Sequence, residues 1–463
     1  MTTHTRQLDT PPPNSRIAVI GSGISGLASA WLLSQKHDVT LLEKNDYLGG
    51  HTHTVNLDTG EGKPVAVDTG FIVYNEPNYP LLTEMLRYLK IDTLKTEMSF
   101  AVSINQGEVE YSGDNLNTLF AQRRNLFSPT HWQMLTDIVR FNRLAKQTLA
   151  AAKASVIPQD YSLTLEDFLA QHGFSDVLIH HYLLPMAAAI WSCPTDTMLK
   201  FPAHSFLQFF ENHGLLNIDD RPQWQTIHNG SNRYIEAIFE DAQRHKRLSA
   251  FTEAPVENIT READGYAIDT PQGRFDGFDH IVFASHADES YALLPDEFKD
   301  QFAPLRAFQY QKNTAYLHGD RQLMPKRRLT WAAWNYLRDK NVAENRVAVT
   351  YWMNKLQSLP TEQNVFVTLN PIEPPAQTLT HAIFEYDHPV FDSAAMQAQG
   401  QLDKLQGLHN LWFAGAYTGY GFHEDGLRSA VNLAERFGLT PPWTPNVETA
   451  KIDRDIQPEV RHA

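Results

Sequence analysis

The sequence contains a single cysteine, Cys193, among 463 residues. One thiol excludes an intramolecular disulfide and a zinc site made of cysteines, and nothing indicates an oxidising compartment. Long apolar runs are also missing. The longest, Tyr182 to Trp191, is half of the roughly 20 residues that span a bilayer, and the first fifteen residues lack the apolar core of a signal peptide. We therefore expect a cytoplasmic protein.

Basic residues are in short supply: 39 Lys and Arg stand against 54 Asp and Glu, for a net charge of -15. Nucleic-acid binding requires clustered basic residues over a broad face, so we expect no such partner. The sequence has no GxSxG elbow and no HExxH motif, and His180-His181 lacks a matching ligand set. We therefore predict neither a hydrolase nor a metal site. Cys193 precedes a proline in apolar surroundings and is predicted to be a buried, unreactive thiol.

A nucleotide-binding pattern stands near the start of the chain. The short β-branched run Arg16 to Ile20 leads directly into Gly21-Ser-Gly-Ile-Ser-Gly26. Apolar residues then recur with the helical period, and a second strand, His37 to Leu42, ends in Glu43. Strand, glycine turn, helix and acid-terminated strand together predict a Rossmann unit.

Each position in this pattern has a physical reason. Gly21 permits the tight turn, Gly23 lets the backbone approach a pyrophosphate, and Gly26 allows close helix–strand packing. The helix N-terminus offers free N–H groups and a positive dipole. Glu43 is placed to accept hydrogen bonds from ribose hydroxyls and would repel a 2′-phosphate, which disfavours NADP. The predicted cofactor contacts of this unit are Gly21, Gly23, Ile24, Ser25, Gly26, Glu43 and Lys44.

A second glycine motif follows. Leu48-Gly-Gly-His-Thr-His-Thr54, and then Val67-Asp-Thr-Gly-Phe71, resemble the glycine doublet of the flavin amine oxidase superfamily, in which an arginine and a threonine usually follow the glycines. His51 stands here in the arginine position. The resemblance implies FAD, with Gly49, Gly50, His51 and Thr52 lining its diphosphate and flavin, although a neutral imidazole binds phosphate less strongly than arginine. The alternative for His51 and His53 is an ordinary polar loop.

The C-terminal part repeats the order of strand, glycine turn and helix. Leu411 to Ala414 is typical of a strand, and a turn beginning at Gly415 leads into a second amphipathic helix. We expect the backbone N–H groups of Gly426 and Leu427 to face a carbonyl of the flavin ring. In the superfamily an acid usually follows the glycine of this strand, whereas Ala416 stands here.

The middle of the chain completes the expected domain. We predict a strand from Pro255 to Thr260, in which the resemblance implies a backbone contact of Val256 to adenine, and a further strand, His280 to Ser285, that closes the sheet. No second GxGxxG follows a strand, so the NAD(P)H domain of two-dinucleotide flavoproteins is missing. Electrons are expected to leave the flavin to oxygen or another acceptor. Cys193 lies far from the C-terminal flavin segment, so noncovalent FAD is expected.

The predicted fold class is α/β, with a Rossmann-type FAD-binding domain and a discontinuous α+β substrate domain of the amine-oxidase-like kind. The FAD-binding domain is expected from residues 15–70, 222–290 and 405–438, and the substrate domain from 71–221 and 291–404. Residues 1–14 and 441–463, rich in proline or in proline and charge, are predicted to be flexible termini.

Several phrases across the chain narrow the resemblance to a bacterial flavoprotein family described as predicted NAD/FAD-binding, amine-oxidase-like proteins. Its members resemble the N-terminal region of plant cyclopropane-fatty-acid synthases and flavin-dependent desaturases of methylated fatty acyl chains. The resemblance implies a lipid acyl substrate. The phrases lie at residues 201–214, 221–226, 324–327, 334–336, 352–354 and 419–429.

The residues themselves support a lipid less strongly. An aromatic stripe from Phe201 to Leu216 is either the lining of an acyl tunnel or, in our preferred interpretation, ordinary core. From Asn117 to Lys153 there are six basic residues and one acid. Arg123 and Arg124, beside apolar residues, could contact anionic headgroups at the inner face of a membrane. A solvated helix face is the simpler alternative.

The mechanism implied is a desaturation, in which hydride leaves one carbon for the flavin and a base or solvent takes a proton from the neighbouring carbon. His423 is the first candidate base, with Glu424 as its partner and Tyr74 and Tyr420 as lesser candidates. Helix capping also explains Glu424 and Asp425, and for Asp425 it is the favoured explanation. Two other functions stay open: an FAD-dependent amine oxidase, and a non-catalytic flavoprotein partner of a lipid methyltransferase.

Overall fold

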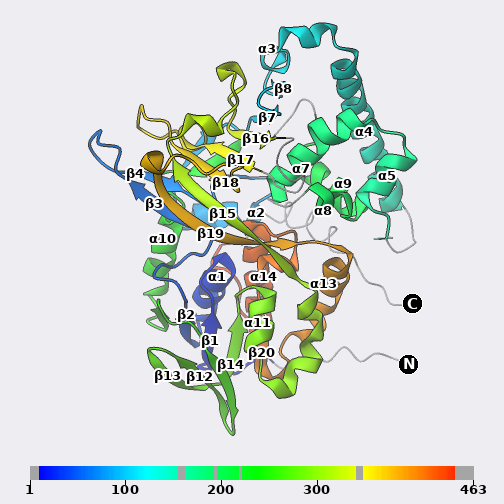
Figure 1. Ribbon diagram of the computed structural model, residues 1–463. Coiled ribbons are helices and arrows are strands. Elements are labelled where there is room, and N and C mark those ends of the chain that lie inside the picture. Colours follow the sequence, from blue (N-terminus) through cyan, green and yellow to red (C-terminus); the bar gives the residue numbers. More distant parts are fainter. Residues whose placement is uncertain (1–9, 155–161, 192–194, 218–221, 340–347, 444–463) are drawn as a thin grey trace.

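A parallel five-stranded sheet forms the lower part of the molecule (Figure 1). The computed structural model describes residues 10–154, 162–191, 195–217, 222–339 and 348–443. The sheet has the order β10-β2-β1-β14-β20, and every neighbouring pair is parallel. Its central strands are apolar and buried, as parallel strands covered on both faces must be. The strands are β1 (Arg16–Ile20), β2 (Asp38–Leu42), β10 (Leu248–Phe251), β14 (His280–Phe283) and β20 (Leu411–Phe413).

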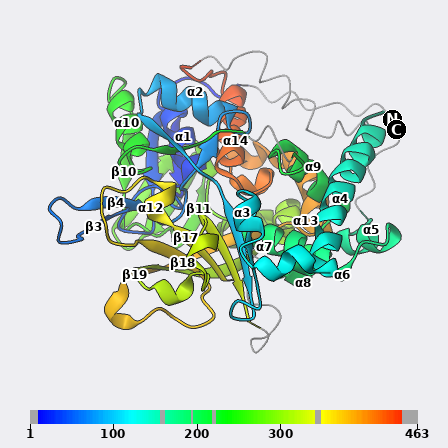
Figure 2. The ribbon, with the colours of Figure 1, turned by 90° about the horizontal axis from the view of Figure 1, so that it is seen from above.

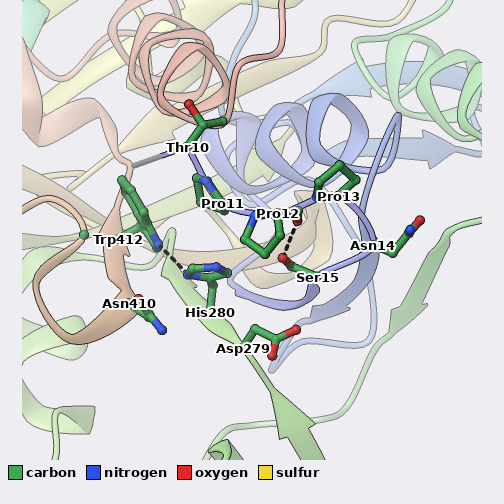
Figure 3. A pocket seen from close by; sticks show the side chains of 11 residues that line it. Thr10, Pro11, Pro12, Pro13, Asn14, Ser15, Asp279, His280, Asn410 and Trp412 are labelled. Carbon is green, nitrogen blue, oxygen red and sulfur yellow. Dashed lines mark hydrogen bonds between the residues drawn. The ribbon is translucent and has the colours of Figure 1, made fainter. Parts of the chain in front are cut away.

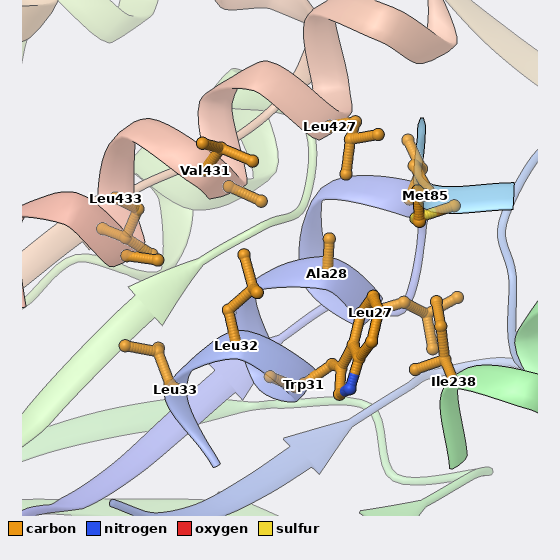
Figure 4. Close-up of a cluster of buried hydrophobic side chains, with 14 of the residues drawn as sticks. Leu27, Ala28, Trp31, Leu32, Leu33, Met85, Ile238, Leu427, Val431 and Leu433 are labelled. Carbon is orange, nitrogen blue, oxygen red and sulfur yellow. The ribbon is translucent and has the colours of Figure 1, made fainter. Parts of the chain in front are cut away.

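One face of this sheet is covered by four helices: α1 (Ile24–Leu33), α2 (Pro80–Tyr88), α10 (Arg233–Ala242) and α14 (His423–Arg436). All ten residues of α1 are buried, because the helix lies between the sheet and its neighbours. Figure 4 shows Leu27 and Trp31 of α1 near Met85 of α2 and Ile238 of α10, with Leu427 of α14 beside the same helix. This cluster fixes the starts of α1 and α14 next to each other.

The other face carries an antiparallel three-stranded sheet and three helical segments. They are β11 (Asn258–Glu262), β12 (Gly265–Thr270), β13 (Gly273–Phe278), α11 (Ala287–Leu293), η3 (Asp296–Ala307) and α13 (Ser393–Leu405). The predicted strand from Pro255 is wrong at its start: β11 begins at Asn258, and Val256 lies in the connection before it, after Ala254, whose N–H donates to Glu43 O at 2.8 Å.

A seven-stranded mixed sheet lies above the parallel sheet, with the order β19-β15-β18-β17-β16-β7-β8. Only the β16–β7 pair among them is parallel. Its strands are β7 (Phe100–Ile104), β8 (Val109–Ser112), β15 (Gln309–His318), β16 (Trp334–Arg338), β17 (Ala348–Trp352), β18 (Phe366–Leu369) and β19 (Thr380–Val390). Smaller sheets pair β3 (Thr54–Leu57) with β4 (Val65–Asp68), and β5 (Tyr74–Asn75) and β6 (Thr93–Thr96) with β9 (Trp224–Ile227).

A lobe of helices stands beside the mixed sheet (Figure 2). It comprises α4 (Pro129–Ala154), α5 (Leu165–Gln171), α6 (Asp176–Leu178), the π-helical turn η2 (Ile179–Leu183), α7 (Leu184–Trp191), α8 (Thr195–Leu199) and α9 (Ala203–Asn212). Phe206 and Phe210 stack at 4.3 Å and both are buried. The aromatic stripe from Phe201 therefore forms packed core, as the preferred interpretation expected.

Short elements complete the chain: α3 (Leu116–Leu119), η1 (Arg123–Phe127), η4 (Arg321–Leu323), η5 (Arg328–Thr330), α12 (Met353–Leu356), η6 (Gln377–Leu379), η7 (Leu408–Asn410) and η8 (Ala416–Thr418). Across the described ranges, no helix has both the length and the apolar character needed to cross a membrane. Cys193 and residues 1–9 and 444–463 fall outside the described residues.

The predicted fold class is confirmed: an α/β Rossmann-type domain is joined to a second domain made of the mixed sheet and the helical lobe. The domain boundaries differ in detail from those expected. Helix α2, expected in the substrate domain, packs with α1 and α14, and η3 and α13 pack beneath the parallel sheet. The apolar faces of α2, η3 and α13 are buried in the domain of the parallel sheet, not in the substrate domain. They include Leu82, Phe302 and Leu402.

Candidate active site

The turn between β1 and α1 has the shape that a dinucleotide requires. Gly21 adopts φ +97° and donates its N–H to Leu42 O at 2.8 Å. A Cβ on Gly26 would lie 1.8 Å from Gly21 O, so only glycine fits there. A Cβ on Gly23 would meet nothing within 4 Å. No side chain caps α1, so its first turn presents N–H groups toward the open space beside Gly23.

The glycine doublet lies against this turn. Gly49 and Gly50 have φ of +126° and +58°, and Gly49 N–H donates to Ser22 Oγ at 3.1 Å. A Cβ on Gly50 would come within 3.1 Å of Gly23 Cα. The two predicted glycine motifs are therefore in contact and line one space.

Glu43 stands at the end of β2 and is buried. Its Oε2 accepts hydrogen bonds from Ser22 N–H at 2.9 Å and Ser22 Oγ at 2.6 Å, while Oε1 accepts from the backbone and side chain of Asn45. These bonds hold the carboxylate at the carboxyl edge of the sheet, where open α/β sheets bind ligands. Lys44 is exposed and pairs with Glu289 of α11 at 2.6 Å. Val256 is half-buried, two residues after the bond of Ala254 to Glu43.

His51, in the position where the superfamily has arginine, packs against strand β19. Its ring lies 5.0 Å from Tyr386 and 5.2 Å from His388. Burial, with further histidines nearby, holds the pKa of His51 well below its usual range, so the ring is neutral. Its Nε2 is buried without a hydrogen-bond partner among the described residues. His53 Nδ1 bonds Tyr386 Oη at 3.0 Å, so these histidines are packed rather than part of a solvated loop.

The residues fit FAD on three independent observations. Open space faces Gly23, and no side chain caps the N-terminus of α1. The buried His51 Nε2 has no hydrogen-bond partner among the described residues, and a polar group of the cofactor would supply one. Neutral His51 supplies a hydrogen bond rather than the charge of an arginine. Within the described ranges, no three His, Cys, Asp or Glu side chains are arranged to hold a metal ion.

His423 is the first residue of α14 and lies at the centre of a hydrogen-bonded group. Its Nε2 is 2.9 Å from Thr52 Oγ1 and 3.0 Å from Tyr234 Oη, and these two hydroxyls also bond each other. The ring stacks on Phe71 with centroids 3.8 Å apart. Burial lowers the pKa of His423 to about 3. The ring is therefore neutral, and its tautomer decides whether Nε2 accepts from or donates to the two hydroxyls.

The predicted pairing of Glu424 with His423 is wrong. The buried Glu424 carboxylate accepts hydrogen bonds from the N–H groups of Leu81 and Leu82 at 2.9 and 3.0 Å, in the first turn of α2. Successive residues on a helix point in different directions, so Glu424 turns to α2 while His423 turns to the glycine doublet. Asp425 has the capping role that was favoured for it, and accepts from the N–H groups of Tyr420 and Phe422 at 3.0 Å.

The prediction that the N–H groups of Gly426 and Leu427 face a carbonyl of the flavin ring is also wrong. Gly426 N–H donates to Phe422 O at 3.1 Å within the helix, and Leu427 is one residue further in and fully buried. The first-turn N–H groups before Gly426 are the ones without an acceptor in the helix. A Cβ on Gly426 would lie 2.7 Å from Ile24 Cγ2, so this glycine serves the contact of α14 with α1. Gly415 N–H donates to Ser429 Oγ at 2.9 Å and ties β20 to the same helix.

The two lesser candidates lie in different surroundings. Tyr74 is buried in the small sheet, with its hydroxyl 3.4 Å from Gln225 Oε1 and burial raising its pKa, and it is separate from the group around His423. Tyr420 is half-buried, and its ring lies 6.4 Å from Phe209 of the helical lobe. Of the four catalytic candidates, His423 is placed beside the glycine doublet by its bond to Thr52, two residues after Gly50.

Sequence reasoning missed four residues of this site: Phe71, Tyr234, Tyr386 and His388. Tyr386 and His388 alternate along β19, and with Phe384 they share the face that meets His51 and His53. This period of two is a signal that could have been found. Tyr234 lies on α10 and follows no motif, so no local signal marks it.

A hollow of about 400 Å³ lies at the opposite edge of the parallel sheet (Figure 3). It is lined by Thr10 to Ser15 and by the amino ends of β14 and β20, where Trp412 Nε1 donates to His280 Nδ1 at 3.2 Å. Ligands of α/β sheets bind at the carboxyl edge. The hollow is therefore separate from the site of Gly23 and His51.

Comparison with known proteins agrees with this geometry. The model of a family described as flavin-containing amine oxidoreductases matches residues 24–336. Over 112 residues the chain is 34% identical to an Arabidopsis thaliana protein named probable flavin-containing monooxygenase 1. The match covers 22% of this chain and only 20% of that protein.

Two solved structures share the fold. A fatty acid isomerase from P. acnes that produces CLA superimposes with a TM-score of 0.62 and 18% identity, over 92% of this chain and 100% of that one. Putrescine oxidase bound to putrescine gives 0.62 and 15% identity, over 92% and 99%. At these identities the likeness concerns the fold.

Proposed function

Because the chain belongs to the flavin-containing amine oxidoreductases and is an FAD-dependent oxidoreductase, we propose that it dehydrogenates a modified fatty acyl chain of a phospholipid. The predicted cofactor and enzyme class are confirmed by the family, while the substrate is our inference. When bound, FAD accepts the hydride that leaves one carbon of the substrate. The residues of the chain must hold that carbon in place.

The observation that carries the proposal is an apolar wall that runs from the helical lobe to His423. Phe422, the residue before His423, stacks on Phe209 at 5.1 Å, and Phe209 stacks on His213 at 3.8 Å. Phe422 and Tyr420 are only half-buried, so both retain surface beside the site. Burial lowers the pKa of His213 to about 4, so this wall carries no charge. Phe209 is packed core, so an acyl chain would contact the half-buried rings of Phe422 and Tyr420, which extend the wall to His423.

Three histidines around the glycine doublet are also neutral. The pKa values of His51, His388 and His423 are all lowered by burial. The buried carboxyl group of Asp68 is occupied by hydrogen bonds from Thr54, Ser231 and Gln357. A protonated amine would therefore find no free anion in this group, which favours an uncharged substrate over an amine.

We assign His423 a positioning role. An imidazole with a pKa of about 3 is a weak base near neutral pH. Its Nε2 instead aligns the hydroxyls of Thr52 and Tyr234 at the glycine doublet. The proton lost from the second carbon of the substrate passes to solvent, the alternative to a protein base in such a dehydrogenation.

Anaerobic mixing of the FAD-loaded protein with phospholipid tests the proposal. A phospholipid that carries a methyl-branched or unsaturated acyl chain should bleach the absorbance of the oxidised flavin, whereas the same headgroup with a straight saturated chain should not. Bleaching by amines alone would make the protein an amine oxidase. No bleaching by lipids or amines would favour the non-catalytic partner of a lipid methyltransferase.

A further inference from the structure

An unusual concentration of exposed apolar side chains surrounds α3 and η1. Phe127 is 88% exposed and Leu116 is 74% exposed, and Leu126 and Trp132 are close to half exposed. Most exposed apolar residues of a folded protein are scattered singly, whereas a contiguous group indicates a binding surface. Figure 1 places α3 and the start of α4 at the end of the molecule remote from the parallel sheet.

Hydrogen bonds hold these residues on one surface. The Arg123 guanidinium donates to Asn117 Oδ1 at 2.6 Å and to Phe120 O at 2.9 Å, which joins η1 to α3. Trp132 Nε1 donates to Leu126 O at 3.0 Å, which joins α4 to η1. These hydrogen bonds therefore hold the exposed apolar side chains of α3, η1 and α4 in fixed positions.

Basic residues flank the apolar ones. Arg123 and Arg124 are exposed on η1. Lys326 and Arg327, just before η5, and Arg328, its first residue, are exposed ahead of the exposed Leu329, and η5 contacts α3. Two exposed acids, Glu108 and Asp114, lie on the adjoining chain, while the buried Glu110 is paired with Arg327 at 2.7 Å. Cations are thus in local excess on a chain whose net charge is -15. We define the α3–η1 surface as Leu116, Arg123, Arg124, Leu126, Phe127, Trp132, Lys326, Arg327, Arg328 and Leu329.

We propose that the α3–η1 surface docks the protein on an anionic phospholipid bilayer. Aromatic and aliphatic side chains flanked by arginine and lysine match the boundary between acyl chains and negatively charged headgroups. The negative remainder of the molecule is repelled by the same membrane, so charge also sets the orientation.

The surface leads toward the site. Helix α4 begins at the α3–η1 surface and packs on α9, which carries Phe209 of the apolar wall beside His423. This link to substrate access rests on the proposed function. Membrane binding itself does not, because it depends on the exposed residues alone.

Sedimentation of the FAD-loaded protein with vesicles tests the proposal without turnover. Vesicles of phosphatidylglycerol and phosphatidylcholine should carry the protein into the pellet, and phosphatidylcholine alone should carry much less. Binding should weaken with added salt as the headgroup charge is screened. Neutralising Lys326 by Lys326→Gln should lower the partition coefficient about fivefold, the equivalent of about 1 kcal/mol for one basic residue at an anionic surface.

The apolar contribution has its own variants. The double change Leu116→Ser with Phe127→Ser should release the protein from anionic vesicles while its flavin spectrum and melting temperature are retained, because both side chains are exposed. Ile383→Ser on β19, an exposed apolar residue elsewhere, is the matched control and should bind as wild type does.

Two results would overturn the proposal: wild-type protein that stays in the supernatant with anionic vesicles, or a double variant that binds them equally well. A wild-type dimer that the double variant dissociates, without vesicle binding, would make the surface a contact between two copies instead. Vesicle binding without flavin reduction by lipid would leave the docking surface standing and reject the proposed substrate.

Discussion

At the scale of single residues, His423 connects parts of the chain that are far apart in sequence. Its Nε2 meets Thr52, 371 residues away, and Tyr234, 189 residues away. Thr52 and Tyr234 are buried and His423 is half-buried, and burial both lowers the pKa of His423 to about 3 and raises the pKa of Tyr234. These three side chains are neutral, so they contribute to the site by positioning and not by charge.

Two substitutions separate positioning from base catalysis at His423. His423→Ala should retain FAD but slow flavin reduction by substrate about a hundredfold, the loss expected from misplaced reacting groups. His423→Gln retains an acceptor near the position of Nε2 and should restore most of the rate. If glutamine is as slow as alanine, or if the wild-type rate rises with a pKa that His423→Gln removes, His423 is a base.

The glycines of the first turn make opposite predictions. Gly23→Ala should fold normally, since its Cβ meets nothing within 4 Å, but should weaken FAD binding because the methyl group enters the cofactor space. Gly26→Ala should lower the melting temperature of the cofactor-free protein, since its Cβ would lie 1.8 Å from Gly21 O. Thermal melts and FAD titrations of both variants measure this. Equal FAD affinity of Gly23→Ala and wild type would contradict the placement of the cofactor.

These positions also show which residues could be predicted from sequence. The roles of Gly21, Gly23 and Gly26 depend on local backbone shape, so their spacing was sufficient. Tyr234 depends on how α10 docks, and no local pattern contains that information. The wrong pairing of Glu424 arose because adjacency along the chain was taken for adjacency in space.

At the scale of elements, α14 organises the site from its first turn. His423 faces the glycine doublet, Glu424 holds the start of α2, and Gly426 packs on α1. A buried carboxylate that accepts two backbone N–H groups acts as a cap supplied by another helix. The position of α2 thus depends on a side chain 342 residues away.

Replacing Glu424 should therefore weaken the contact between these helices. Glu424→Ala leaves the N–H groups of Leu81 and Leu82 without this acceptor in a buried setting, which should cost about 1–3 kcal/mol of the free energy of unfolding. Urea unfolding measures the loss. Glu435→Gln, at an exposed position of the same helix, is the control and should change stability little. A Glu424→Ala variant as stable as this control would remove the capping role.

At the scale of the whole molecule, the Rossmann unit could be predicted, because strand–turn–helix patterns are local. The assignment of α2, η3 and α13 to the layers of that sheet could not, since an amphipathic face does not identify its partner. The aromatic core of the helical lobe likewise gave no sign that it reaches Phe422.

Histidines whose pKa is lowered by burial make the stability of the protein depend on pH. Each has a native pKa below its unfolded value of about 6.5, so the unfolded chain binds more protons as the pH falls below that value, and stability is lost. Asp68 has the opposite effect: its pKa is raised to about 6, so its protonation stabilises the folded protein as the pH falls from about 6 to about 4. This single carboxyl group offsets only part of the loss from five histidines. The five are His213, His280, His318 and His388, at about 4, and His423, at about 3.

The free energy of unfolding of the cofactor-free protein should therefore fall from about pH 7.5 to about pH 5.5, by on the order of 1 kcal/mol per imidazole per pH unit. Urea unfolding at the two pH values measures it. Unchanged or greater stability at the acidic value would show that these imidazoles are not held neutral.

The central claim, that this flavoprotein dehydrogenates an acyl chain, is tested most directly by mass spectrometry of phospholipid after a single anaerobic turnover. We predict that a phospholipid with a methyl-branched or unsaturated chain loses two hydrogen atoms, in amounts equal to the flavin reduced. Phospholipid of unchanged mass beside flavin that an amine readily reduces would contradict the claim.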